Sequence, residues 1–108
     1  MPDATRLRAL ALSLPEAFER ETWGKPTFRI GAKLFATLAA DEQSVVLRAT
    51  YEEQAAMLAH DPDTFAVAPY QGRYGWIRVR LATIAEDQLA ELVTEAWRQA
   101  APKRLATG

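Results

Sequence analysis

The alternating stretch WIRVRL at residues 76–81 is the feature that most restricts how this chain can fold. Successive side chains of a β-strand point to opposite faces, so this stretch divides into two sets. The apolar set comprises Ile77, Val79 and Leu81. The opposite set comprises Trp76, Arg78 and Arg80. A strand of this kind buries its apolar side in a core and leaves an aromatic and cationic side open.

The same period of two recurs upstream, in residues 27–30, 33–38 and 45–49. The expected core positions are Phe28, Ile30, Leu34, Ala36, Leu38, Val45, Leu47 and Ala49. Residues 31–32 and 39–44 connect these strands, and both connections are too short for the crossover that parallel strands need. The sequence therefore predicts an antiparallel sheet with one buried face.

Three segments have the features of helices. Asp3 is expected to cap a first helix, and Thr50, with Glu53 three residues later, is expected to form a capping box for a second. Residues 86–100 place apolar side chains at helical spacing and predict a third helix, while residues 103–108 are expected to fray. Helices and antiparallel strands in this order predict an α+β fold, a two-layer sandwich with the helices packed on one face of the sheet.

The length of 108 residues is that of one domain, which we expect to span residues 1–108. The sequence contains no cysteine, so disulfides and thiolate metal sites are excluded. The apolar run near the N-terminus is interrupted by Asp3, Arg6 and Arg8 and is too short to span a membrane. We therefore expect a cytoplasmic protein that has no membrane partner.

The net charge of −1 conceals an uneven distribution of charge along the chain. Residues 20–34 hold four cations and one acid, and residues 70–81 hold three arginines and no acid. Residues 86–98, in the third predicted helix, hold four acids and one arginine. The pattern predicts basic strands and an acidic helix, so a polyanion would be contacted from the strand side.

The cations and aromatic side chains of the predicted open face suit contacts with nucleic acid. Arginine and lysine contact phosphates, and exposed aromatic rings stack on bases. Tyr70 lies in the loop before the last strand, and residues 72–75 of that loop could act as a wing in a groove. The candidate nucleic-acid-binding residues are Arg78, Arg80, Arg73, Trp76, Tyr74, Lys33, Arg29 and Arg48.

Two alternatives stay open for this surface. Exposed strand positions favour arginine, threonine and tryptophan for ordinary structural reasons, and Trp76 could be covered by Tyr70 or by the corner at Trp23. The same face could instead bind a protein partner or a small anionic ligand, with a carboxylate or phosphate held by Arg78 and Arg80.

The sequence offers no recognisable catalytic constellation. No feature places the single histidine, His60, beside Ser13 or Ser44, which are the two serines of the chain. The paired acids fall at loops and helix starts, and no glycine-rich phosphate-binding motif occurs. We therefore expect a non-enzymatic protein with no cofactor and no metal site.

Two longer segments, WGKPTFRIGAKLFATL (23–38) and APYQGRYGWIRVRL (68–81), resemble the MmcQ/YjbR family of small bacterial proteins. The resemblance covers essentially the whole chain. It implies a CyaY-like (frataxin-like) α+β fold and a DNA-binding role that is attributed to a double wing of strands and loops. The strongest matches are Trp23, Gly24, Pro26, Phe28, Gly31, Lys33, Phe35, Pro69, Tyr70 and Trp76.

The frataxin-like fold does not bring iron chemistry with it. Frataxins collect iron on an acidic ridge that includes the first helix, whereas the first helix here carries Arg6 and Arg8. The expected function is therefore DNA binding without catalysis. The type of nucleic acid, the cellular process and the oligomeric state stay open. Residues 23–26 are expected to form a tight corner between strands, in which Trp23 has a structural role.

Overall fold

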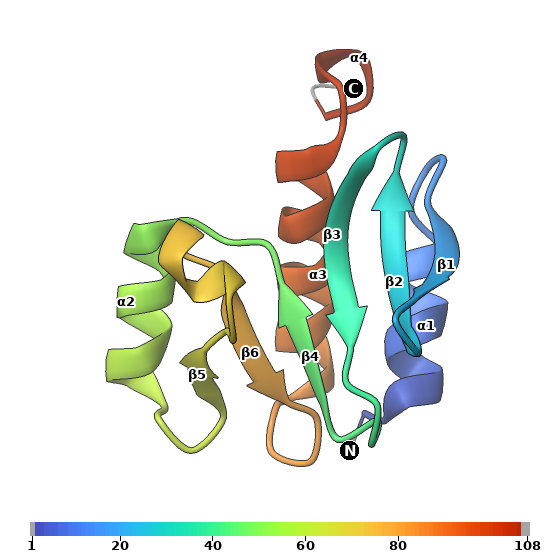
Figure 1. The fold of residues 1–108 in the computed structure, drawn as a ribbon. Coiled ribbons are helices and arrows are strands. Elements are labelled where there is room, and N and C mark those ends of the chain that lie inside the picture. Colours follow the sequence, from blue (N-terminus) through green and yellow to red (C-terminus); the bar gives the residue numbers. More distant parts are fainter. Residues whose placement is uncertain (1, 107–108) are drawn as a thin grey trace.

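Six strands form one antiparallel sheet in the computed structural model, which describes residues 2–106 of the chain. The strand order across the sheet is β1-β2-β3-β4-β6-β5 (Figure 1). The strands are β1 (Phe18–Thr22), β2 (Lys25–Ile30), β3 (Lys33–Leu38), β4 (Ser44–Leu47), β5 (Phe65–Val67) and β6 (Ile77–Arg80). The short connections predicted this antiparallel pairing, and the pairing is confirmed.

The helices are unequally distributed around the sheet (Figure 1). α1 and α3 cover one face, whereas α2 lies beside the edge strand β5 and buries none of its residues fully. The helical elements are α1 (Ala4–Leu12), α2 (Tyr51–His60), the 3₁₀ turn η1 (Gln71–Tyr74), α3 (Glu86–Ala100) and α4 (Lys103–Ala106). The α+β fold class is thus confirmed. Of the three predicted helices, α2 differs from the expectation, because it packs beside the edge strand β5 and does not cover the face of the sheet. Within residues 2–106, no helix is long and apolar enough to cross a membrane.

Both predicted helix starts have the expected hydrogen bonds. The Asp3 carboxylate accepts from the backbone N–H of Arg6 at 2.9 Å, at the start of α1. The Thr50 hydroxyl accepts from the Glu53 N–H at 3.2 Å, and the Glu53 carboxylate accepts from the Thr50 N–H at 2.9 Å. This reciprocal pair satisfies two donors that a helix N-terminus otherwise leaves unpaired.

The C-terminal segment is more ordered than the sequence suggested. Arg104 donates from both terminal nitrogens to the Glu16 carboxylate at 3.0 and 3.1 Å, and Leu105 packs against the core. The prediction that the tail frays is therefore wrong for residues 103–106, and residues 107–108 lie outside the described residues. A fork-to-carboxylate pair fixes the orientation of this short helix, although an exposed pair adds little stability.

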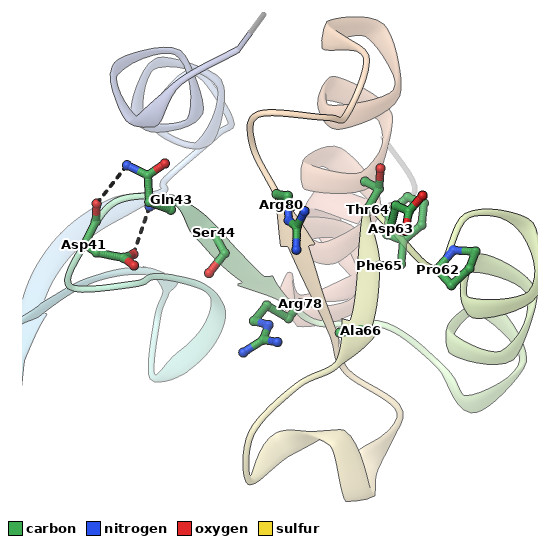
Figure 2. A pocket seen from close by; sticks show the side chains of 10 residues that line it. All are labelled: Asp41, Gln43, Ser44, Pro62, Asp63, Thr64, Phe65, Ala66, Arg78 and Arg80. Carbon is green, nitrogen blue, oxygen red and sulfur yellow. Dashed lines mark hydrogen bonds between the residues drawn. The ribbon is translucent and has the colours of Figure 1, made fainter.

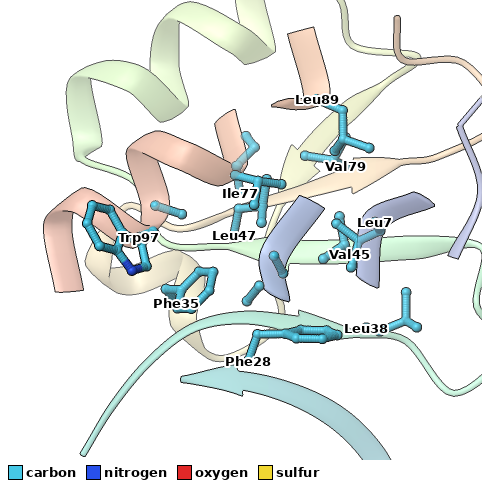
Figure 3. Close-up of a cluster of buried hydrophobic side chains, with 14 of the residues drawn as sticks. Leu7, Phe28, Phe35, Leu38, Val45, Leu47, Ile77, Val79, Leu89 and Trp97 are labelled. Carbon is cyan, nitrogen blue, oxygen red and sulfur yellow. The ribbon is translucent and has the colours of Figure 1, made fainter. Parts of the chain in front are cut away.

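The hydrophobic core lies between the sheet and the pair α1 and α3 (Figure 3). On β6 and just after it, the apolar residues Ile77, Val79 and Leu81 are buried, as their alternation predicted. Trp97 of α3 is also buried, and its indole N–H donates to the Pro15 carbonyl at 3.0 Å. The predicted strand parity is confirmed for residues 77–81, so the even-numbered side chains of β6 face away from the helices.

A β-bulge interrupts the pairing of β2 with β3. Phe28 pairs with Ala36, but the next residue, Arg29, pairs with Leu34. Phe35 is therefore an extra residue on β3, and its ring is fully buried in the core. An extra residue shifts the alternation by one. Strand residues before the bulge therefore point to the face opposite to the one that a regular strand would give them.

The bulge overturns three predicted facings, the first being that of Phe35, which the alternation placed opposite the expected core positions and which is buried instead. Leu34, which was expected in the core, shares the open side of the sheet with its partner Arg29. Lys33, which was expected on the open side, pairs with the buried Ile30 and so belongs to the opposite side. Lys33 is thus separated from the other candidate cations.

Candidate nucleic-acid interface

The face of the sheet that lacks helices carries a set of cations from three strands. Directly paired residues of antiparallel strands point to the same side, so the register assigns each side chain to a face. Arg20 of β1 pairs with Thr27, and Thr27 lines the same cavity as Arg29. Five cations share this side of the sheet, and we call them the basic face: Arg20, Lys25, Arg29, Arg78 and Arg80.

Carboxylates are paired with cations only on the helix side of the described chain. The ion pairs there have N–O distances of 2.6 to 3.0 Å. They are Arg6–Glu86, Arg8–Glu19, Arg98–Glu95 and Arg104–Glu16. Within residues 2–106, no cation of the basic face forms an ion pair with a carboxylate. The positive charges of this face are therefore available to an external anion.

Arg78 and Arg80 extend from β6 into a hollow at one end of the open face (Figure 2). Both side chains are exposed, and their strand partners are Val46 and Ser44 on β4. The hollow has a volume of about 260 Å³. We call it the arginine hollow; it is lined by Asp41, Gln43, Ser44, Pro62, Asp63, Thr64, Phe65, Ala66, Arg78 and Arg80. Asp41 and Asp63 thus place negative charge beside the two guanidinium groups.

Trp76 is covered and does not serve as an exposed stacking surface. Only 8% of its surface is accessible, because the Arg48 guanidinium lies over its ring, 4.7 Å from the centroid. Arg48 also donates from Nε to the Leu34 carbonyl at 3.0 Å. Desolvation of the guanidinium lowers the pKa of Arg48 from its usual range. The prediction that Trp76 is an exposed stacking surface is therefore wrong, whereas phosphate contact by the half-buried Arg48 stays a prediction.

The loop before β6 is a short 3₁₀ turn braced by α2. The Gln54 side chain donates to the carbonyls of Gly72 and Trp76 at 3.1 and 2.8 Å, which fixes both ends of the turn. Arg73 and Tyr74 project from it, with the guanidinium 4.9 Å from the Tyr74 ring centroid. Tyr74 is 57% exposed, so this pair remains at the surface beside the sheet.

Trp23 and Tyr70 are the most exposed of the large hydrophobic side chains in the described chain. Trp23, expected to be structural, is 97% exposed at the turn between β1 and β2. Tyr70 is 90% exposed at the turn before η1. The sequence did contain a signal for Trp23, because a residue in a two-residue hairpin turn projects into solvent.

Trp23 and Tyr70 line one cavity of about 340 Å³ on the open face. We call it the aromatic cavity; its lining is Thr22, Trp23, Lys25, Thr27, Arg29, Leu34, Thr37, Val46, Pro69, Tyr70 and Gln71. Arg29 is oriented there by hydrogen bonds from its guanidinium to the hydroxyls of Thr27 and Thr22, at 3.3 and 3.2 Å. The cavity therefore combines two aromatic walls with two cations and the hydroxyls of three threonines.

Titratable groups do not gather into a recognisable metal or catalytic site in the described region. No three histidine or acidic side chains between residues 2 and 106 are placed to hold a metal ion. His60 is exposed in the last turn of α2. The chemistry of the surface is thus that of cations, hydroxyls and aromatic rings.

These features define a small α+β protein with one helix-covered face and one basic, aromatic face. The YjbR family model matches residues 12–99, which is most of the chain, so the protein belongs to the YjbR family. The resemblance seen in the sequence is confirmed by this match.

The comparisons with individual proteins give uncharacterized relatives and a shared fold. Over an aligned segment of 50 residues, the chain is 42% identical to uncharacterized proteins of Mycobacterium bovis (Mb2600) and Mycobacterium tuberculosis (Rv2570 and MT2646). That match covers 46% of this chain and 39% of the length of each relative. The crystal structure of Deinococcus radiodurans protein DR2400, with the family-model domain DUF419, superposes with a TM-score of 0.84 at 18% identity. The superposition covers 99% of this chain and 87% of that one, and it shows that the two share a fold.

Proposed function

We propose that this protein is a non-enzymatic DNA-binding protein that contacts phosphates with its basic face. The observation that carries the proposal is the segregation of ion pairs within residues 2–106. Four arginines on the helix side form ion pairs with carboxylates, whereas none of the five cations of the basic face does. Unpaired arginine and lysine side chains neutralise phosphates and release condensed counterions, which supplies most of the affinity of non-specific DNA binding.

The spacing of the cations favours a polyanion over a small anion. Lys25 and Arg29 lie on β2, and Arg78 and Arg80 lie on β6, with β3 and β4 between them. Three strand spacings of about 4.8 Å separate the two rows by about 14 Å. A small anion would therefore contact one row at a time, whereas a DNA backbone that crosses the strands can contact both.

A phosphate or carboxylate held in the arginine hollow is the competing function. The hollow offers two exposed guanidinium groups and the hydroxyl of Ser44. Asp41 and Asp63 oppose it, because they lower the positive potential where the anion would sit. We therefore favour DNA and treat the small anion as the alternative outcome of the experiment.

The test is a titration of fluorescently labelled DNA with variants of each cation row, over a range of salt concentrations. The variants are Arg78→Gln with Arg80→Gln, and Lys25→Gln with Arg29→Gln. The matched control is Arg6→Gln with Arg98→Gln, which removes the same two charges from the helix side. Circular dichroism checks that each variant is folded.

We expect both sheet variants to weaken binding and the control to bind like the wild type. Each lost phosphate contact should reduce the slope of log affinity against log salt by about 0.9, so each pair should reduce it by about 2. Equal losses in all three variants would mean that net charge alone matters and would reject the basic face. Loss in the Arg78 and Arg80 variant alone would instead favour a small anion in the arginine hollow.

A further inference from the structure

The aromatic cavity is enclosed by two residues whose backbones adopt an unfavourable conformation. Trp23 has φ 52° and Tyr70 has φ 63°, in the left-handed region that large side chains rarely occupy. At Tyr70 the strain is a γ-turn, in which the Gln71 N–H donates to the Pro69 carbonyl at 2.7 Å. Burial of the rings does not compensate for this strain, since both rings are almost fully exposed.

Backbone strain of this kind concentrates at binding sites, where the surrounding structure holds a side chain in a required position. Here the turn between β1 and β2 holds Trp23 at one wall of the aromatic cavity. The segment before η1 holds Tyr70 at another wall. Two exposed rings on one cavity provide flat apolar surfaces that can accept a planar ligand.

The polar lining of the aromatic cavity specifies the charge of that ligand. Lys25 and Arg29 belong to the lining, and none of its eleven residues is acidic. Thr22 and Thr27 bind the Arg29 guanidinium through their hydroxyls and so hold it within the lining. A planar group that carries a nearby negative charge would meet complementary groups on all sides.

The size and shape of the aromatic cavity exclude an intact duplex. Its volume of about 340 Å³ is at the lower end of the range for small-molecule pockets. Bases within a duplex are stacked on their neighbours and present no face to an aromatic side chain, whereas unpaired bases do. The ligand class that fits is therefore a single nucleotide unit with a free base.

We propose that the aromatic cavity binds one unstacked base of a single-stranded nucleic acid, with the adjoining phosphate on Arg29 and Lys25. This inference rests on the proposed function, because the rest of the strand runs over the basic face. The base lies against Trp23 and Tyr70, and the backbone continues toward Arg78 and Arg80. The protein therefore binds single strands more tightly than duplexes of the same length.

The test compares the oligonucleotide dT12 with a 12-base-pair duplex as ligands for the full chain. The variants are Trp23→Ala and Tyr70→Ala, and Trp23→Phe retains an aromatic face. The control is Tyr51→Ala, which removes an exposed aromatic ring from the start of α2, outside the aromatic cavity. Thermal unfolding confirms that each variant is folded before affinities are compared.

We expect Trp23→Ala and Tyr70→Ala each to weaken dT12 binding by about fivefold to a hundredfold, the usual effect of losing one base–aromatic stack. Duplex affinity should stay unchanged in both variants, and Trp23→Phe and Tyr51→Ala should bind dT12 nearly as the wild type does. If both alanine variants bind dT12 normally while loss of Arg78 and Arg80 weakens it, the cavity proposal fails and the proposed function stands. If neither ligand binds the wild type, both proposals are wrong.

Discussion

Arg48 and Trp76 form a cation–π contact on the open face, with the guanidinium 4.7 Å from the centre of the indole ring. The Nε of Arg48 is occupied by the Leu34 carbonyl, so the side chain links β3 and β4 to the residue that precedes β6. Its role is to stabilise the sheet, which distinguishes Arg48 from the exposed arginines around it.

Replacing Arg48 should therefore affect stability more than the other cations do. Arg48→Ala removes a desolvated cation–π contact and leaves the Leu34 carbonyl without its donor, so we expect a loss of about 2 kcal/mol in the free energy of unfolding. Arg78→Ala should change it by less than about 0.5 kcal/mol, because that side chain is exposed. Urea denaturation measures both. A fully stable Arg48→Ala variant that loses DNA affinity would support Arg48 as a binding residue.

The strain at Trp23 predicts an opposition between stability and binding. Asn and Gly accept positive φ in a two-residue turn, so Trp23→Asn should raise the free energy of unfolding by about 0.5 to 1 kcal/mol. The same variant should weaken dT12 binding, because the indole face is gone. Chemical denaturation and an affinity measurement on one preparation test both effects. Unchanged or reduced stability would show that the turn is not strained.

Gly75 is expected to tolerate no side chain. It has φ +94°, and a Cβ placed on it would lie 2.5 Å from the Tyr51 nitrogen and 2.7 Å from the Thr50 carbonyl carbon. Gly75→Ala should therefore destabilise the protein by about 3 kcal/mol or more, because backbone atoms of α2 must move. Gly24→Ala is the control: its φ is +78° but nothing lies within 4 Å, so about 1 kcal/mol is expected. Similar losses at both positions in thermal or urea unfolding would contradict the packing argument.

Asp63 should reduce the affinity of the basic face for nucleic acid. Its carboxylate lies on the lining of the arginine hollow, beside Arg78 and Arg80. Asp63→Asn keeps the shape and removes the negative charge, so DNA affinity should rise by about twofold to fivefold at low salt. The control Glu91→Gln makes the same charge change on α3, on the helix side. Fluorescence titration measures both, and equal gains would indicate a general charge effect.

The pairing of Glu16 with Arg104 predicts that the docking of α4 depends on pH. The hydrogen bond from Arg104 lowers the pKa of Glu16 below its ordinary value of 4.5. The folded state therefore binds the proton more weakly than the unfolded state does. The contribution of the pair is fully present above about pH 4.5 and is lost as the pH falls through the lowered pKa.

The amide NMR signal of Leu105 reports this docking, because the Leu105 side chain packs against the core. We expect its chemical shift to titrate below pH 4.5 in the wild type. In Glu16→Gln the shift should be independent of pH over that range. A titration that persists in the variant would assign the effect to another carboxylate.

Local chemistry made much of the fold predictable from the sequence. Capping at Asp3 and Thr50 depends on residues within one helical turn, and the alternation before Leu81 depends on a single strand. The bulge at Phe35 was not predictable, because a single extra residue leaves the apolar pattern of β3 nearly unchanged. That one residue moved Lys33 off the basic face.

The candidate site was predictable only where the position of a side chain depends on its own strand. Arg78 and Arg80 face outward because of the parity of their own strand. The Arg48 guanidinium that lies over Trp76 comes from the residue after β4, and the pattern of one strand carries no information about such a contact. The roles of all these residues in binding stay predictions.

The separation of paired from unpaired cations also bears on how a complex would form. The acids of α3 and the cations of the basic face lie on opposite sides of the sheet, so charge is distributed unevenly across the thickness of the molecule despite a net charge of only −1. A polyanion's field turns such a molecule before contact, so that the sheet arrives first. Added salt should therefore slow the encounter strongly, while the lifetime of the complex depends more on the contacts made after arrival.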